Sequence, residues 1–113
     1  MSTGALEAVG RALDRGGDAD DVLRAVVEAL AAEPAIDWAG IRFVEDGLLV
    51  LGPSAGTPDE ALRTVTEIAY RGETVGELVV DGDVGRSLLE DVAAQISPYV
   101  LLGWDTGGAL WEP

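Results

Sequence analysis

The side chains that could carry chemistry in this sequence are three carboxylates, one guanidinium and one indole. Glu77 and Asp81 lie at an even spacing in one apolar segment, and Glu67 lies in the segment before it. Trp38 and Arg42 are spaced in the same way further upstream. Carboxylates attract cations, an indole ring offers a π face to a cation, and an arginine can pair with a carboxylate. These five residues predict a site for a small zwitterionic, amino-acid-like ligand.

Each of these residues also has a structural interpretation. Trp38 could be an aromatic residue of the core or its rim. Glu67, Glu77 and Asp81 could form the solvated face of an open sheet, and Arg42 could be a structural ion-pair partner. The sequence leaves both interpretations open.

Cysteine and histidine do not occur in the chain. Their absence excludes a disulfide, a thiolate nucleophile, a Cys/His zinc site and a Ser-His-Asp triad built from these residues. Acid–base catalysis would need Asp, Glu or Tyr, and a metal would need oxygen ligands, as Mg²⁺ and Ca²⁺ do. Neither an EF-hand spacing nor a P-loop is present. We therefore expect no catalytic residue, no metal and no cofactor, and a protein that is not an enzyme.

The composition is that of one acidic, folded domain spanning residues 1–113. Hydrophobic residues make up 48%, the formal net charge is −14, and all basic residues are arginine. Such a surface repels phosphate, so neither nucleic acid nor an anionic membrane is an expected partner, although a basic protein could be one. No apolar run approaches the roughly 18 residues of a membrane span. Residues 1–7 lack the pattern of a signal peptide, so we expect a cytoplasmic protein.

Helical periodicity predicts two helices before the strands. The first covers residues 3–15 and ends at Gly16-Gly17. The second is expected to be capped by Asp18 or Asp20 and closed by Pro34. Its apolar face consists of Val22, Leu23, Val26, Val27 and Leu30.

A third helix is predicted to begin near Val84 or Gly85. Pro98 lies inside it and should kink it or leave a local break. A tail at residues 103–113 carries Trp104 and Trp111, which could bind a partner or fold over the open sheet. The apolar face of this helix consists of Leu88, Leu89, Val92, Ile96, Val100 and Leu101.

Alternating residues between the helices predict two β-hairpins. The first turns at Asp46-Gly47, and the second turns at Arg71-Gly72-Glu73. Residues 52–59 are expected to be a loop between the hairpins. The simplest sheet pairs the first and last strands at its centre, with helices on one face, which is an α+β layout. The expected strands are Trp38–Val44, Leu48–Leu51, Thr64–Tyr70 and Thr74–Asp81.

Alternation also sorts the strand residues onto two faces. The second turn would place Glu67 opposite Glu77, and these carboxylates would need Arg42 or a ligand ammonium between them. The helix-facing set is Ala39, Ile41, Phe43, Thr66, Ile68, Tyr70, Gly76, Leu78 and Val80. The opposite set is Trp38, Gly40, Arg42, Glu67, Glu77, Val79 and Asp81.

Four short motifs resemble the GAF domain family, and more narrowly its free methionine-R-sulfoxide reductase branch. Asp37-Trp38-Ala39-Gly40-Ile41-Arg42 is similar to an Asn-Trp-Val-Gly-Phe-Tyr pattern on the first strand of that branch. Leu51-Gly52-Pro53 is similar to the end of its second strand, with Gly56 matching a later glycine. Thr66-Glu67-Ile68-Ala69 looks like a Ser-Glu-Ile-Val pattern. Val75-Gly76-Glu77-Leu78-Val79-Val80-Asp81 looks like the final strand, and the resemblance covers residues 18–102.

The resemblance implies a GAF-like antiparallel sheet of about four strands with the N- and C-terminal helices on one face. In that branch a tryptophan, a glutamate and two aspartates hold the amino-acid part of the ligand. Trp38, Glu67 and Asp81 match three of them, and Val79 stands in place of the first aspartate. The catalytic cysteines and the long insertion that carries them have no counterpart here.

Two functions follow as hypotheses. The first is a non-catalytic, ligand-sensing or regulatory module of the GAF kind in signal transduction. The second is a protein-interaction or dimerisation module that uses the terminal helices or the open sheet face. An enclosed pocket around Trp38 would favour the first, and a flat face packed on a second chain would favour the other.

Overall fold

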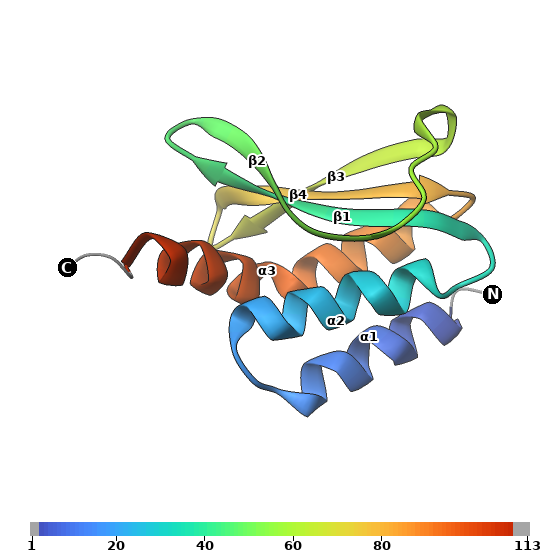
Figure 1. Ribbon diagram of the computed structural model, residues 1–113, viewed down its shortest axis with the longest axis horizontal. Helices are drawn as coiled ribbons and strands as arrows, with labels where there is room; N and C mark the ends of the chain where they lie inside the picture. Colours follow the sequence, from blue (N-terminus) through green and yellow to red (C-terminus); the bar gives the residue numbers. More distant parts are fainter. Residues whose placement is uncertain (1–2, 110–113) are drawn as a thin grey trace.

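The computed structural model describes residues 3–109, without the side chains of residues 3, 5 and 102–109. In chain order it contains α1 (Thr3–Arg15), α2 (Ala19–Ala31), β1 (Ile36–Glu45), β2 (Leu48–Gly56), the 3₁₀ turn η1 (Glu60–Leu62), β3 (Arg63–Tyr70), β4 (Glu73–Gly82) and α3 (Arg86–Ala109). Figure 1 shows a sheet lying over a layer of helices.

The first two helices form where the apolar periodicity predicts them. All five residues of the predicted apolar face of α2 are buried. Gly16 and Gly17 both have positive φ and reverse the chain between α1 and α2. Asp18 lies at the N-cap position of α2, one of the two positions predicted, but its carboxylate makes no capping hydrogen bond.

The third helix is longer than predicted. It continues through Pro98 to Ala109, so of the predicted kink or local break at Pro98 the break does not occur, and the predicted tail beginning at residue 103 is wrong. Ser97, just before the proline, donates its hydroxyl to the carbonyl of Ala94 at 3.0 Å. The side chain of Trp104 and the whole of Trp111 lie outside the described part of the chain.

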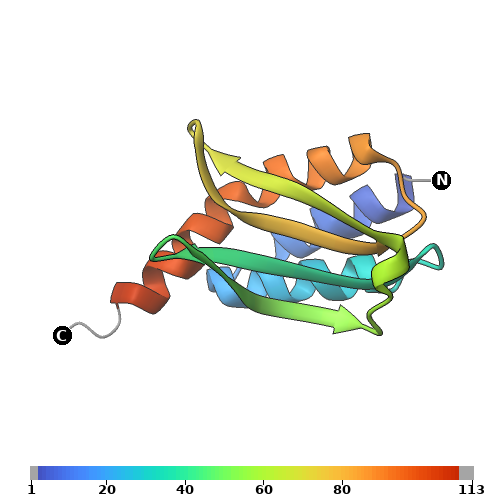
Figure 2. The ribbon, with the colours of Figure 1, turned by 90° about the horizontal axis from the view of Figure 1, so that it is seen from above.

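The sheet has the strand order β2-β1-β4-β3, and every neighbouring pair is antiparallel. The predicted arrangement, with the first and last strands central, is therefore confirmed. Figure 2 looks down on this sheet and shows β2 and β3 at its two edges. The central strands bring Trp38 beside Asp81 and Arg42 beside Glu77.

The predicted loop at residues 52–59 is wrong for its first half. β2 continues to Gly56, because a shift in register between Gly40 and Arg42 lets the chain pass Gly52-Pro53 and resume pairing at Ser54. A proline is tolerated there because β2 is an edge strand and its outer side needs no ladder donor. The real connection is short, since η1 begins at Glu60.

Both hairpins turn on two residues with positive φ, Asp46-Gly47 and Arg71-Gly72. This is the geometry that suits the twist of paired strands. The predicted three-residue turn is wrong, because Glu73 already pairs with Tyr70. A register shift between Ile68 and Ala69 nevertheless restores the predicted pairing of Glu67 with Glu77.

All three helices lie on one side of the sheet, as predicted. α2 and α3 lie directly against the strands, and α1 packs on α2 away from them (Figure 1). The core between these layers contains the helix-facing residues Ala39, Ile41, Ile68, Leu78 and Val80 together with the apolar faces of the helices. The other face of the sheet is left without helices. Within the described residues, no helix is long and apolar enough to cross a membrane.

Candidate functional site

The open face of the sheet carries its side chains in three rows that cross the strands. The register places Trp38, Asp81 and Arg63 in the first row. Gly40, Val79 and Val65 form the second row. The third contains Arg42, Glu77 and Glu67. The rows follow from the two-residue period of paired strands.

Trp38 lies flat on this face. A Cβ placed on Gly40 would come within 2.4 Å of Cη2 of the Trp38 ring, so the indole occupies the space that a side chain would fill. Trp38 is only 7% exposed and Val79 is fully buried. Neither belongs to the core cluster between sheet and helices. The open face therefore has a small apolar centre of its own.

Asp81 is the most confined charged group on the face. Its carboxylate is fully buried and accepts two hydrogen bonds from Arg63, from Nε at 2.8 Å and from Nη2 at 2.9 Å. The backbone N–H of Asp59 donates a third bond to Oδ2 at 2.7 Å. The guanidinium of Arg63 also lies 5.2 Å from the centre of the Trp38 ring. The guanidinium of Arg63 thus makes a bidentate ion pair with Asp81 and a cation–π contact with Trp38.

These contacts set the charge state of the pair. The hydrogen bonds from Arg63 lower the pKa of Asp81 below its ordinary 3.8, against the opposing effect of burial, and the Asp59 N–H lowers it further. The same bonds raise the pKa of Arg63. Both groups therefore carry full charge over the physiological pH range.

The third row contains a second ion pair. Nη1 of Arg42 lies 3.1 Å from Oε1 of Glu77, and both side chains are partly exposed. Glu67 instead accepts a hydrogen bond from the hydroxyl of Thr74. The two facing carboxylates therefore have different partners, and Arg42 is the cation of Glu77.

The five predicted site residues do not form one cluster. Asp81 and Glu77 are four residues apart on β4, which is about 13 Å along a strand. Trp38 and Asp81 lie at one end of the face, while Arg42, Glu67 and Glu77 lie at the other. Val79 separates the two groups. Among the described residues, no group of three or more acidic side chains is placed to hold a metal ion.

Sequence reasoning missed Arg63. The residue was assigned to the connection between the hairpins, yet it is the first residue of β3. A signal was present, because Arg63, Val65 and Glu67 alternate and thus share a face. The signal could be used only once the register with Asp81 was known.

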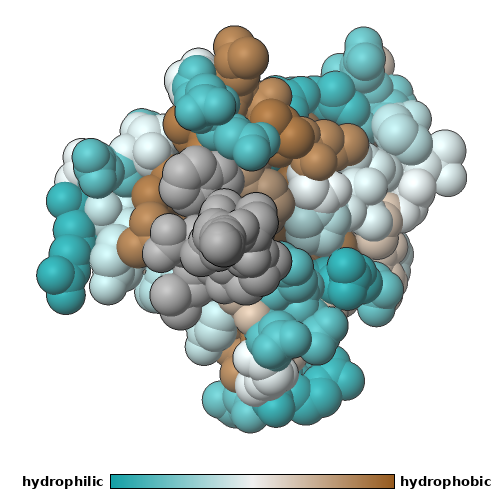
Figure 3. Space-filling model, turned by 60° about the vertical axis from the view of Figure 1, so that its left-hand side comes forward, coloured by the Kyte–Doolittle hydropathy of each residue, from teal (hydrophilic) through white to brown (hydrophobic). Residues whose placement is uncertain are grey.

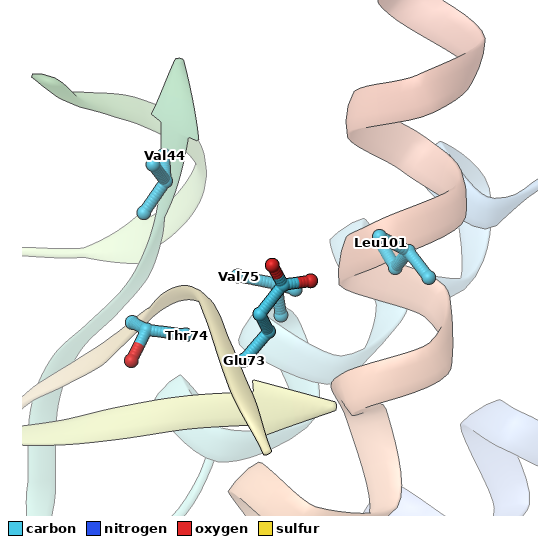
Figure 4. Close-up of a pocket in the computed structure, with 5 residues that line it drawn as sticks. All are labelled: Val44, Glu73, Thr74, Val75 and Leu101. Carbon is cyan, nitrogen blue, oxygen red and sulfur yellow. The ribbon is translucent and has the colours of Figure 1, made fainter. Parts of the chain in front are cut away.

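The described cavities lie away from this face. One, of about 180 Å³, is lined by Val44, Val75 and Leu101 with Glu73 and Thr74, between the hairpin turns and α3 (Figure 4). Another is a shallow depression along α1. Neither includes any of the five predicted site residues.

No protein-family model matches this sequence, and no curated protein matches it in sequence. Solved structures do match in three dimensions. The GAF domain of the phosphoenolpyruvate-protein phosphotransferase of Acinetobacter aligns over 90% of this chain and 95% of its own, with a TM-score of 0.68 and 16% identity. The free methionine-R-sulfoxide reductase of Staphylococcus aureus, solved with substrate, aligns over 88% of this chain and 95% of its own, with a TM-score of 0.67 and 15% identity.

A type II free methionine-R-sulfoxide reductase from Thermoplasma acidophilum aligns over 73% of this chain and 92% of its own, with a TM-score of 0.61 and 18% identity. The chain has a GAF-like fold. The resemblance and the fold class predicted from the sequence are therefore confirmed.

The prediction that the chain is not an enzyme is contradicted. Two of the structures described above, which align with this chain at 15% and 18% identity, are reductases. The prediction rested on missing nucleophiles, and the absence of one class of nucleophile does not decide whether a fold used by enzymes supports a reaction. The GAF-like fold gives no ground for excluding catalysis.

Proposed function

We propose that this chain is a regulatory, ligand-sensing domain of the GAF kind that binds a small, zwitterionic, amino-acid-like molecule on the open face of its sheet. The observation that carries the proposal is the fully buried carboxylate of Asp81 beside the Trp38 ring. The charge is paired with Arg63, but removing both charges from water costs free energy that the pairing often fails to return, so a buried ion pair on a sheet face is a candidate for a functional role.

The rest of the face supports the same ligand class. At the end of the face that holds Trp38, Asp81 offers a carboxylate and Arg63 a guanidinium, so partners for both ends of a zwitterion lie in one row. The helices cover only the opposite face, which leaves this one accessible (Figure 1). The exposed edge of the Trp38 ring would contact the aliphatic part of such a ligand.

The test is binding of a panel of amino acids and amines, measured by calorimetry. We expect at least one zwitterionic compound to bind the wild-type chain, and Asp81→Asn and Trp38→Phe to weaken that binding. The matched control is Glu28→Gln, a carboxylate on the exposed side of α2, which should bind like wild type. Binding that is indifferent to the two open-face substitutions, or no binding at all, would overturn the proposal.

One observation favours a second function, a protein-interaction or dimerisation module. The edge strand β2 exposes four consecutive apolar residues, Leu48 at 69%, Leu49 at 46%, Val50 at 42% and Leu51 at 54%. Figure 3, which brings the left-hand side of Figure 1 forward, shows hydrophobic surface towards the top of the molecule. Exposed apolar edge strands tend to pair with other chains. Light scattering of wild type and Leu49→Lys would test this: a dimer that the substitution dissociates supports it, and a wild-type monomer at high concentration contradicts it.

A further inference from the structure

Arg63 is held in the manner in which proteins hold a guanidinium ligand. Its Nε and Nη2 face the two oxygens of Asp81, and its Cζ lies over the Trp38 ring. A planar guanidinium satisfies a bidentate carboxylate and an aromatic face together, whereas an ammonium is a point charge that does not match this geometry. We call Trp38, Asp81 and the N–H of Asp59 the guanidinium site.

The site is assembled without Arg63. Trp38 and Asp81 belong to the two central strands, and the ring position is fixed by the space above Gly40. The Asp59 N–H comes from the short connection after β2, which is anchored by Thr57 donating to the carbonyl of Asp37 at 2.8 Å. Arg63 itself starts the edge strand β3, and its side chain is 21% exposed. The side chain can therefore leave towards solvent without opening the core.

A second partner for the displaced side chain already lies nearby. The carboxylate of Glu60, which is 84% exposed, lies 3.7 Å from Nη1 of Arg63. Asp81, by contrast, keeps only the Asp59 N–H when Arg63 leaves, so its buried charge would require a replacement cation. A guanidinium from solution would restore every contact that Arg63 makes.

We propose that Arg63 is the internal occupant of a guanidinium-binding site, and that the ligand of this face is a small molecule with a guanidinium group that exchanges with it. The inference rests on the proposed function and names its substrate class. The tethered side chain competes at high local concentration, so the wild-type chain binds such a ligand with reduced apparent affinity. Occupancy would release Arg63 and the connection before it, a change that a regulatory domain can pass on.

The experiment is a titration of the full chain with methylguanidinium, and separately with methylammonium, at constant ionic strength. Binding is followed by NMR at the indole N–H of Trp38, assigned with Trp38→Phe. Wild type is compared with Arg63→Ala. The matched control is Arg24→Ala, which removes an exposed arginine that pairs with Asp21 on α2, on the helix side of the sheet.

We expect Arg63→Ala to bind methylguanidinium about tenfold more tightly than wild type, since the internal competitor is gone. It should prefer methylguanidinium to methylammonium, and Arg24→Ala should bind like wild type. Equal binding by Arg63→Ala and wild type, or no preference for the guanidinium, would overturn the inference. If Arg63→Ala does not fold, Arg63→Gln keeps much of the side-chain stem and must show the same gain.

The two proposals fail separately. If wild type binds no compound of the amino-acid panel while Arg63→Ala gains methylguanidinium binding, the regulatory function is wrong and the guanidinium site stands. If the panel binds wild type while Arg63→Ala gains nothing, the function stands and the guanidinium site is wrong.

Discussion

At the scale of single residues, Asp81 makes the most contacts among the charged groups described on the open face. Its carboxylate accepts hydrogen bonds from Arg63 and from the backbone N–H of Asp59, and Arg63 in turn lies over the Trp38 ring. Trp38 and Asp81 were identified from the sequence, because alternation puts them on one face and they match ligand-holding residues of the family that the sequence resembles. Arg63 was not, because its role depends on a pairing between strands 18 residues apart. The sequence was enough to single out the acceptor, Asp81, but its donor, Arg63, could be found only once the register between β3 and β4 was known.

The pairing of Asp81 predicts a pH dependence of stability. Its hydrogen bonds lower its pKa in the folded chain, so the stability that it contributes is present above its ordinary pKa of 3.8 and is lost as pH falls through the lower folded value. Asp81→Asn should therefore cost most near neutral pH and progressively less below that range. Urea unfolding across acidic and neutral pH measures this, with the exposed Asp83→Asn as control. A cost that is independent of pH would show that the ion pair contributes nothing.

The packing of Trp38 on Gly40 predicts opposite effects for two similar substitutions. Gly40→Ala places a methyl 2.4 Å from the indole and should destabilise the chain by about 1–3 kcal/mol. Gly10→Ala, inside α1 with open space around it, should instead stabilise by about 0.5–1 kcal/mol through helix propensity. Thermal melting of both variants distinguishes them. Two similar shifts would mean that the ring does not lie over Gly40.

At the scale of elements, apolar periodicity located the helices and strands but not all of their ends. β2 was cut short at Leu51 because Gly52-Pro53 reads as a loop, whereas an edge strand can absorb both residues by shifting register. α3 was predicted to end before a tail at residue 103, whereas the helix continues to Ala109 with Pro98 inside it. In both elements the prediction gave too much weight to residues that disfavour the regular structure in isolation.

Because one face of α2 and one face of α3 are buried, a charged residue introduced there should strongly lower the stability of the chain. Leu23→Asp in α2 and Leu89→Asp in α3 each bury an unpaired carboxylate in the core, and each should cost about 4 kcal/mol or more. Circular dichroism melting is the measurement. Gln95→Asp, on the exposed side of α3, is the control and should stay close to wild type. Cooperative, wild-type-like melting of either leucine variant would show that its helix does not pack as described.

At the scale of the whole molecule, the strand order was predictable from two hairpins and the need to cover one face. The division of the open face into two groups was not, because it depends on which rows the register creates. The strong acidity has a consequence at this scale. With a formal net charge of −14, self-repulsion opposes folding, and salt should relieve it.

We therefore expect the melting temperature to rise between low salt and about 0.15 M sodium chloride, where the screening length is about 8 Å. Calorimetric melting measures the shift, and sucrose at the same osmolality is the control. A melting temperature that falls with salt would mean that the ion pairs of Arg63 and Arg42 outweigh the general repulsion.

We propose that this domain binds its ligand on the open face around Trp38 and Asp81. The most direct measurement is NMR of the ¹⁵N-labelled wild-type chain titrated with the compound that binds best in the amino-acid panel. We expect the largest shifts at Trp38, Asp59, Arg63, Val79 and Asp81, with α1 unaffected. Shifts confined to Leu48–Leu51, or to the cavity beside Val44 and Leu101, would contradict it.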